Sequence, residues 1–266
     1  MTAQMRMNEN YEIKDGVHKL EQRTPSNPRL EHLRDHKNFD IEFSPSGKVL
    51  QVTNYTGALI VHSREYLLYD DQLTLALSVE LDAAYRCKKI TSLESFDKGV
   101  KTWITRTTLG QETNRAIELF DDGRLLSVKS FDGDGHLKIE KTFEYAENKL
   151  AKCDSNYYGI GGSLAECWIS HYNADGRIAD TFGLKPNGEP LGDGRYKFEY
   201  DSEGRESKVW SFNEWDDVAT SVKTYEYKCD QRGNWIERRA LNQSRSDSYW
   251  RTEITTRKLT YYPSPE

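Results

Sequence analysis

Aromatic and aliphatic residues alternate with polar ones along most of the chain, and this period of two predicts β-strands with one apolar face. The clearest run alternates Tyr196, Phe198 and Tyr200 with charged residues. Tyr and Phe are common on half-buried pleated surfaces. A short polar turn from Asp201 to Gly204 follows, and then a second alternating run. The pattern predicts a β-hairpin.

The residue types in this turn explain how the hairpin closes. An Asp that opens a turn accepts backbone N–H groups two residues on, and a closing Gly tolerates positive φ. This chemistry is typical of a type I turn followed by a left-handed residue. The same unit occurs five times between residues 116 and 241, in turns closed by Gly123, Asn148, Gly176, Gly204 and Gly233, which lie 25, 28, 28 and 29 residues apart. Asn is the next-best residue for that backbone region.

Fainter copies extend the repeat toward the N-terminus, over residues 41–55, 65–81 and 90–107, with a half-copy at 130–143. Self-similarity at a fixed period indicates an array of one supersecondary unit. We therefore predict an all-β fold of antiparallel hairpin repeats of about 24–29 residues, with roughly 14–18 strands. The expected shape is one elongated, twisted sheet, open or wound, because strand count alone does not fix closure.

The alternation also divides the chain into segments. Residues 1–37 are polar and are expected to form a flexible or loosely docked leader, residues 38–262 a single repeat domain, and residues 263–266 a tail. The first residues lack the apolar segment of a signal peptide. The four cysteines have no C-x-x-C pair and are expected to be reduced thiols. Together these features predict a cytoplasmic location.

Composition narrows the class of partner. Hydrophobic residues make up 36% of the 266 residues and aromatic ones 12%, which fits a sheet with a thin core in which Tyr and Trp replace aliphatic mass. The net charge is −6, with both signs interspersed, so the basic stripe typical of nucleic-acid binding is absent. No apolar run reaches membrane-spanning length. We expect a protein partner, with neither nucleic acid nor membrane.

Several turns resemble the YD repeats, also called Rhs repeats. The matching phrases start at Phe120, Tyr172, Tyr200 and Tyr227, each an aromatic residue followed by Asp or Asn and then by Gly-Arg or Gly-Asn. The resemblance covers about residues 39–241, and Asn148 and Gln72 depart from the motif. In large members of that family such repeats form a wound β-sheet shell around a toxin domain. Small stand-alone proteins of this appearance are similar to immunity proteins of polymorphic toxin systems, so the resemblance implies a bacterial antitoxin.

Motifs that could carry catalysis or bind metal are sparse. His32 and His36 could share a helix face as two metal ligands do, but no Glu follows His32 as a zinc protease requires. The segment from Asp132 to His136 resembles the start of a calcium loop, but the twelfth position of that loop is Phe143, and the same residues fit a hairpin turn. We interpret it as a turn.

Two further motifs have similarly plain interpretations. The Gly-rich stretch 159–162 has no helix pattern after it, so a flexible loop explains it better than phosphate binding. Cys167 and His171 would point to the same face of a strand, but a Cys–His nucleophile pair needs an orienting third group that the sequence does not supply. We therefore expect no enzyme, no cofactor and no metal.

Aromatic residues flanked by acids are the better functional candidates. Aromatics are enriched at interface hot spots, and acidic neighbours would steer a basic partner. The candidate partner-binding residues, all expected in loops, are Asp154, Tyr157, Tyr158, Glu214, Trp215, Asp216 and Asp217. Trp215 could instead cap the edge of the sheet.

Three functions remain open from the sequence. The first is an immunity protein that occludes the active site of a basic toxin domain. The second is a structural fragment or accessory of a YD-repeat shell. The third is a carbohydrate-binding β-protein whose tryptophans stack on sugar rings, and its candidates are Trp168, Trp210, Trp215, Trp235 and Trp250, most of which are expected to pack in the sheet.

Overall fold

A computed structural model describes residues 17–23, 37–56, 60–69, 75–213, 217–245 and 250–263. These residues form eighteen β-strands and one short 3₁₀ turn, η2 (Ile160–Gly162). The first nine strands are β1 (Val17–Arg23), β2 (Lys37–Phe43), β3 (Val49–Thr56), β4 (Ile60–Tyr69), β5 (Leu75–Asp82), β6 (Cys87–Asp97), β7 (Val100–Thr107), β8 (Glu112–Asp121) and β9 (Arg124–Asp132). The other nine are β10 (Leu137–Ala146), β11 (Lys149–Tyr158), β12 (Leu164–Tyr172), β13 (Ile178–Leu184), β14 (Pro190–Tyr200), β15 (Glu206–Phe212), β16 (Ala219–Cys229), β17 (Trp235–Ser244) and β18 (Trp250–Tyr261). No described helix is long and apolar enough to cross a membrane.

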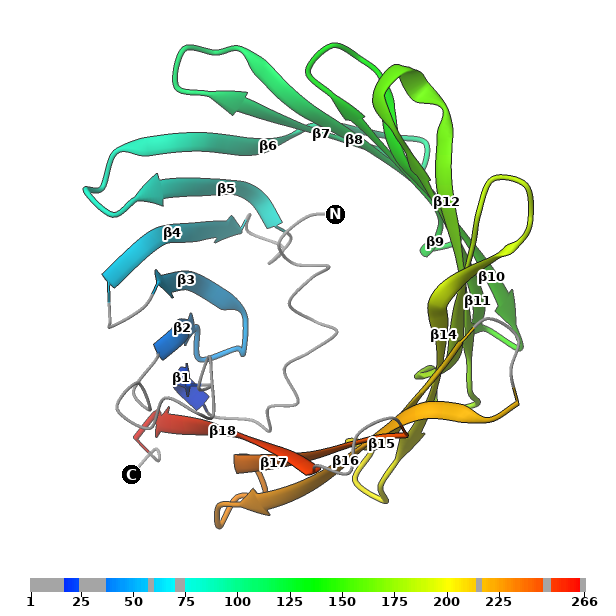
Figure 1. The fold of residues 1–266 in the computed structure, drawn as a ribbon. Coiled ribbons are helices and arrows are strands. Elements are labelled where there is room, and N and C mark those ends of the chain that lie inside the picture. The colour runs from blue at the N-terminus through cyan, green and yellow to red at the C-terminus, as the bar shows by residue number, and fades with distance from the viewer. Residues whose placement is uncertain are drawn as a thin grey trace.

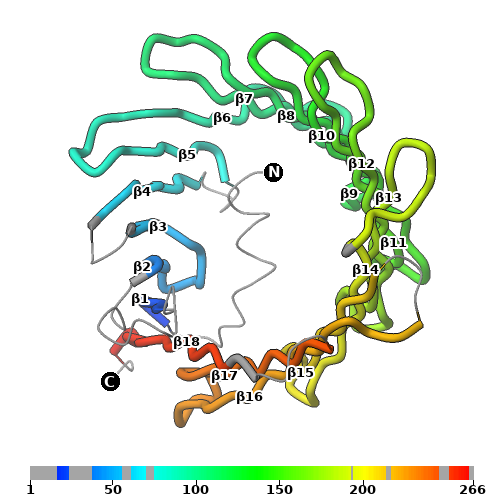
Figure 2. The backbone as a smooth tube through the Cα atoms, viewed as in Figure 1, coloured from blue at the N-terminus to red at the C-terminus, as the bar shows by residue number. Residues whose placement is uncertain are grey.

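The strands form one closed antiparallel barrel. Each strand from β2 to β17 pairs with the next strand along the chain, and β1 pairs with both β18 and β2. Figure 1 shows the result: the last strand, in red, returns to lie beside the first, in blue. The backbone trace in Figure 2 follows the same up-and-down path around the ring. Closure removes the two unpaired edges that an open sheet of this length would expose.

The prediction of an all-β fold is confirmed, whereas the prediction of an elongated sheet, open or wound, is wrong. The strands close because β1 pairs with β18 on one side and β2 on the other, in registers centred on Leu20–Leu259 and Leu20–Ile41. Strand β1 lies inside the segment 1–37 expected as a leader, where the sequence pattern showed no strand. That one strand converts an array of hairpins into a barrel.

The turn chemistry is as predicted. Gly123, Gly176, Gly204 and Gly233 all have positive φ, and Asn148 takes the same region with φ of 68°. The side chains of Asn173, Asp201 and Asp230 each accept two backbone N–H groups, from the residues two and four positions on. The side-chain acceptor and the left-handed residue together fix each hairpin loop.

One face of the barrel wall is more buried than the other. Strand register places Trp103, Ala116 and Ser130 opposite one another on β7, β8 and β9, and all three are buried. Side chains converge on the inside of a closed sheet and diverge on its outside, so this buried face is the inner one. Following the register around the ring places Leu20, Ile41 and Ala240 among the buried inner-face residues as well.

The hydrophobic core lies in the N-terminal half of the barrel. One cluster of buried side chains joins β1, β2, β3, β4, β5, β7 and β8, with Leu20 and Ile41 fully buried and Trp103 5% exposed. This half corresponds to the fainter sequence repeats, which are richer in Leu, Val and Ile. The clearer repeats, from residue 116 onward, form the other half.

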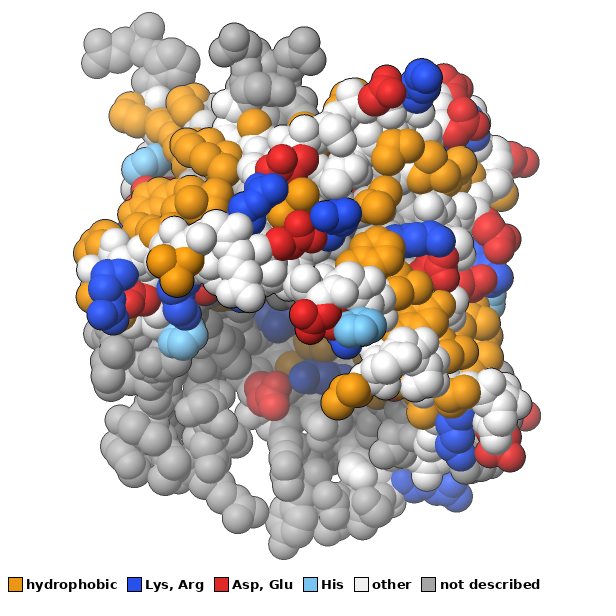
Figure 3. Space-filling model, turned by 90° about the horizontal axis from the view of Figure 1, so that it is seen from above, with side chains coloured by type: hydrophobic (Ala, Val, Ile, Leu, Met, Phe, Trp, Pro, Cys, Tyr) orange, Lys and Arg blue, Asp and Glu red, His pale blue; other side chains and the backbone are white. Residues whose placement is uncertain are grey.

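The outer face carries ion pairs that join neighbouring strands. Lys129 on β9 pairs with Glu140 on β10 at 3.0 Å, and Arg239 on β17 pairs with Glu226 on β16 at 3.8 Å. Figure 3 shows the mixture: basic, acidic and hydrophobic side chains are interspersed over the visible described surface. Opposite charges facing each other across strands stabilise the sheet by up to about 1 kcal/mol per pair.

Candidate functional site

An open pocket lies on the outer face of the barrel where β14, β15 and β16 meet. Its volume is about 500 Å³, and its lining includes Trp210 and Phe212 of β15 together with Lys197 and Glu199 of β14. Strand register explains the grouping, because Lys197 stands directly opposite Trp210. The rest of the lining comes from Phe198 of β14, Ala179 of β13, and Asp217, Val218 and Ala219 around the start of β16. We call this cavity the Trp210 pocket.

The aromatic floor of the Trp210 pocket is held in place by cations. Phe212 is only 6% exposed, and the Arg195 guanidinium carbon and the Lys197 Nζ lie 5.1 and 5.5 Å from its ring centroid. The Lys208 Nζ lies 5.8 Å from the ring of Trp210, which is half-buried. Cations within about 6 Å of a ring centroid are attracted to the face of the ring. These contacts fix both rings while leaving part of the indole accessible.

Charged side chains of both signs lie around the aromatic floor. Lys197, Glu199 and Asp217 are exposed and line the pocket, and the exposed Val218 adds an apolar contact. Lys donates hydrogen bonds only, whereas ionised carboxylates only accept them. The pocket therefore offers an apolar ring surface beside separate donors and acceptors.

The sequence-predicted partner-binding residues are not brought together as one described site. Asp154, Tyr157 and Tyr158 lie on strand β11, not in a loop as expected. Asp217 lies beyond β12, β13 and β14, in the connection after β15. The other three predicted residues, Glu214, Trp215 and Asp216, lie outside the described residues. Their role in binding a partner stays a prediction.

Within β11 the predicted residues point to different faces and have partners of their own. Asp154 is on the outer face, 2.8 Å from the Lys152 Nζ. Tyr157 is on the inner face, where burial raises the pKa of its hydroxyl. The Tyr158 hydroxyl donates to Glu140 at 3.0 Å. These contacts account for the side chains as parts of the barrel wall.

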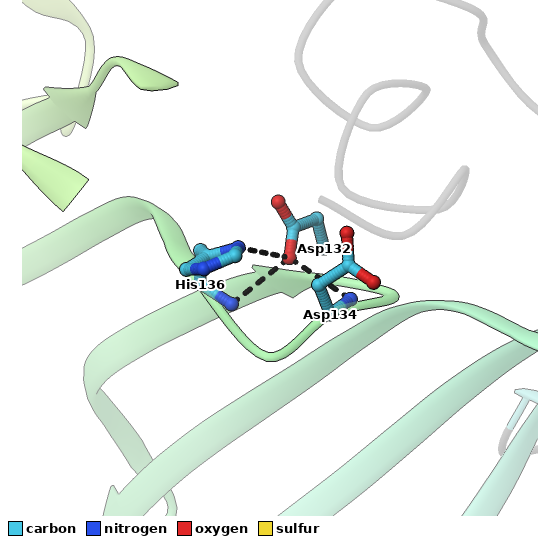
Figure 4. Close-up of side chains that lie close together, drawn as sticks. All are labelled: Asp132, Asp134 and His136. Carbon is cyan, nitrogen blue, oxygen red and sulfur yellow. Dashed lines mark hydrogen bonds and ion pairs between the residues drawn. The ribbon is translucent and has the colours of Figure 1, made fainter. Parts of the chain in front are cut away.

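Figure 4 shows the cluster formed by Asp132, Asp134 and His136, whose potential ligand atoms lie within 4.8 Å of one another. The Asp132 Oδ1 already accepts the backbone N–H groups of Asp134 and His136, at 3.1 and 2.9 Å. The Lys138 Nζ lies 3.0 Å from its second oxygen. The hydrogen bond from Lys138 and then that from the His136 backbone lower the pKa of Asp132 to about 2. The contacts of the Asp132 carboxylate thus stabilise the hairpin turn that the sequence predicted.

The remaining motifs have structural roles where they are described. The 159–162 stretch forms η2 at the connection between β11 and β12. Cys167 and His171 lie on the same face of β12 as expected, but His171 contacts Asp180, and burial raises the pKa of the Cys167 thiol. A raised pKa disfavours the thiolate that a nucleophile needs. His32 and His36 lie outside the described residues.

Among the tryptophans named as sugar-binding candidates, Trp210 is the one that lines the described pocket. Trp235 is 4% exposed and packed against Tyr227. Trp168 is on the inner face, stacked on Tyr196 with ring centroids 6.4 Å apart. Trp210 is recognisable in the sequence as a candidate, but its charged neighbours on β14 are not, because their proximity depends on strand register.

Comparison with known proteins gives likeness in structure alone. No protein-family model and no curated protein sequence matches the chain. A crystal structure of a porin-like protein from Bacteroides uniformis is 12% identical over 92% of this chain and 98% of its own, with a TM-score of 0.49. A porin-like protein from Bacteroides vulgatus is 11% identical over 94% of this chain and 100% of its own, with a TM-score of 0.32. The strand pairing itself defines the chain as an up-and-down antiparallel β-barrel.

These findings correct four predictions made from the sequence. The assignment to the YD-repeat family is wrong, because the hairpins belong to a closed barrel and no family model matches. The immunity-protein and shell-fragment functions that depended on that resemblance are withdrawn with it. The cytoplasmic location is withdrawn as well, because it was inferred for a hairpin array and the strands form a closed barrel instead. The polar N-terminus and the cysteines, from which that location was inferred, do not show where a closed barrel lies.

Proposed function

We propose that this barrel is a carbohydrate-binding protein and that the Trp210 pocket holds the sugar. The observation that carries the proposal is the combination of an accessible indole with Lys197, Glu199 and Asp217 around one open cavity. The carbon–hydrogen face of a sugar ring packs on an aromatic surface, and its hydroxyl groups both donate and accept hydrogen bonds. The pocket offers a partner for each of these groups.

The position of the pocket supports reversible binding of a ligand from solvent. Its floor is rigid, because Phe212 is buried and Trp210 is flanked by paired strands on both sides. Binding to a pre-formed surface avoids the cost of ordering it. A volume of about 500 Å³ is within the range of small-ligand sites and would accommodate one or two sugar rings.

The test is calorimetric titration of the full chain with a panel of neutral mono- and disaccharides, followed by the same titrations on variants. Trp210→Ala should abolish the binding seen for the wild type, and Glu199→Gln should weaken it by about tenfold through loss of a charged acceptor. Trp168→Phe is the matched control, because Trp168 lies on the opposite face. Wild-type protein that binds no sugar of the panel, or Trp210→Ala that binds as well as wild type, would refute the proposal.

A further inference from the structure

Two arginines lie side by side on the inner wall of the barrel, on the face opposite to the Trp210 pocket. Arg238 of β17 and Arg257 of β18 both lie over the indole of Trp235, with guanidinium carbons 5.6 and 3.3 Å from the ring centroid. The Arg238 guanidinium also lies 5.2 Å from the ring centroid of Tyr225. The register confirms the shared face, because Arg238 stands opposite Tyr227 and Thr255.

Arg257 is buried, and Arg238 is half-buried with its Nε atom buried. Arg257 is 7% exposed and donates through Nε to the Gln22 side chain at 3.3 Å, whereas Trp235 beneath it is 4% exposed. The Nε of Arg238 is buried and has no hydrogen-bond partner among the residues that the structure describes. Leaving a buried donor of a charged group unsatisfied is costly, typically 1–3 kcal/mol or more. An anion beside Arg238 would remove part of that cost.

Acidic side chains of the described part of the chain do not neutralise Arg238 by an ion pair. Glu253, on the same face of β18, is instead engaged by the Lys223 Nζ at 3.2 Å. Burial, with Glu206 and Glu253 nearby, raises the pKa of Tyr225 to about 12, so this hydroxyl stays protonated and can donate. The two guanidinium groups and this phenol are all hydrogen-bond donors, and the nearby carboxylate of Glu253 is held by Lys223.

We propose that Arg238 and Arg257 form an oxyanion-binding site on the inner wall of the barrel, suited to a carboxylate or phosphate group of a ligand. Arginine presents a planar fork of N–H donors that matches both groups in bidentate geometry. The rings of Trp235 and Tyr225 hold the guanidinium groups in place before the anion arrives. This site is independent of the sugar site, because it lies on the other face and its two arginines are on β17 and β18.

The test is calorimetric titration of the full chain with inorganic phosphate, glucuronate and glucose at low ionic strength. Phosphate, glucuronate or both should bind with an affinity that falls as salt is added, and Arg238→Gln should weaken that binding at least about tenfold. Phosphate alone would indicate a phosphorylated ligand and glucuronate alone a carboxylate-bearing one. Glucose separates the sites, because its binding should depend on Trp210 and not on Arg238.

Arg239→Gln is the matched control, since this exposed neighbour lies on the outer face near Glu226 and should leave anion binding unchanged. Arg238→Lys keeps the positive charge but lacks the planar guanidinium, so it should bind the anion more weakly than wild type. Circular dichroism checks that each variant folds, and Arg238→Lys replaces Arg238→Gln as the test if the Gln variant does not fold. The proposal is refuted if wild type binds neither phosphate nor glucuronate, or if Arg238→Gln and Arg238→Lys bind as tightly as wild type.

Discussion

The guanidinium of Arg205 lies over the ring of Tyr227, 4.9 Å from its centroid, while the Tyr227 hydroxyl donates to the backbone carbonyl of Glu206 at 3.0 Å. The tyrosine of one hairpin thus covers the turn of the hairpin before it. The same arrangement recurs where Tyr200 donates to the Ile178 carbonyl and where Tyr145 donates to the Leu125 carbonyl. In each case, the acceptor lies two residues after the turn glycine. This contact is the physical reason why aromatic residue, turn and arginine repeat together in the sequence.

Tyr227→Phe should therefore destabilise the barrel by about 1 kcal/mol, the usual net contribution of a neutral hydrogen bond. The substitution keeps the ring, so the contact with Arg205 remains and the hydroxyl alone is tested. Tyr85→Phe is the control, because Tyr85 is 62% exposed and should change stability by less than about 0.5 kcal/mol. Urea unfolding measures both. Equal stabilities for the two variants would contradict the role of the hydroxyl.

Hairpins and turns could be predicted from the sequence because their signals are local. The turn at Gly204 needs an acceptor at Asp201 and a residue that tolerates positive φ, and both are visible within four positions. The Trp210 pocket could be predicted only in part. Trp210 is recognisable as an aromatic residue on a strand, but its neighbour Lys197 is fixed by register across β14 and β15. Register depends on the whole sheet and not on a short window.

The turn at Asp132 gives an acid-stability prediction. Its folded-state pKa is about 2, lowered from 3.8, so the unfolded chain binds more protons than the folded one between these values. The carboxylate therefore contributes stability that is complete above about pH 4 and is lost as the pH falls toward 2. Asp132→Asn should flatten the fall in the urea midpoint between about pH 4 and 2. Asp134→Asn, in the same turn, should leave the wild-type slope; an unchanged slope in Asp132→Asn would contradict the prediction.

Two turn glycines separate backbone strain from steric conflict. Gly99 and Gly123 have φ of +81° and +75°, so Ala at either position pays about 1–2 kcal/mol for the left-handed backbone. A Cβ at Gly99 would also collide with the backbone carbonyl oxygen of Phe120, whereas nothing lies within 4 Å at Gly123. Gly99→Ala should therefore cost about 1–3 kcal/mol more than Gly123→Ala in urea unfolding. Equal losses of stability in the two variants would contradict this prediction and show that the β8 backbone at Phe120 shifts to accommodate the Cβ at no cost.

Barrel closure could not be predicted because the closing strand does not follow the period of two. Val17 and Leu20 of β1 are both buried, although they are three residues apart. A register shift between Val17 and Lys19 accounts for this spacing. An extra residue in one strand breaks the alternation, so the segment looks like a polar leader when it is viewed as sequence. The all-β fold class can be predicted from local alternation in the sequence, whereas closure of the barrel depends on the irregular strand β1.

Leu20→Ala tests whether β1 holds the barrel closed. Leu20 is fully buried in the core cluster and stands opposite both Leu259 and Ile41, so its truncation should cost about 2–5 kcal/mol. Loosening β1 would expose the edges of β18 and β2, and exposed edges pair with other chains. Light scattering after size exclusion should therefore detect larger assemblies in Leu20→Ala and not in Leu68→Ala, whose side chain is 52% exposed. A variant that loses stability by this amount but keeps the wild-type mass would show that the core, and not the closing strand, accounts for the effect of Leu20.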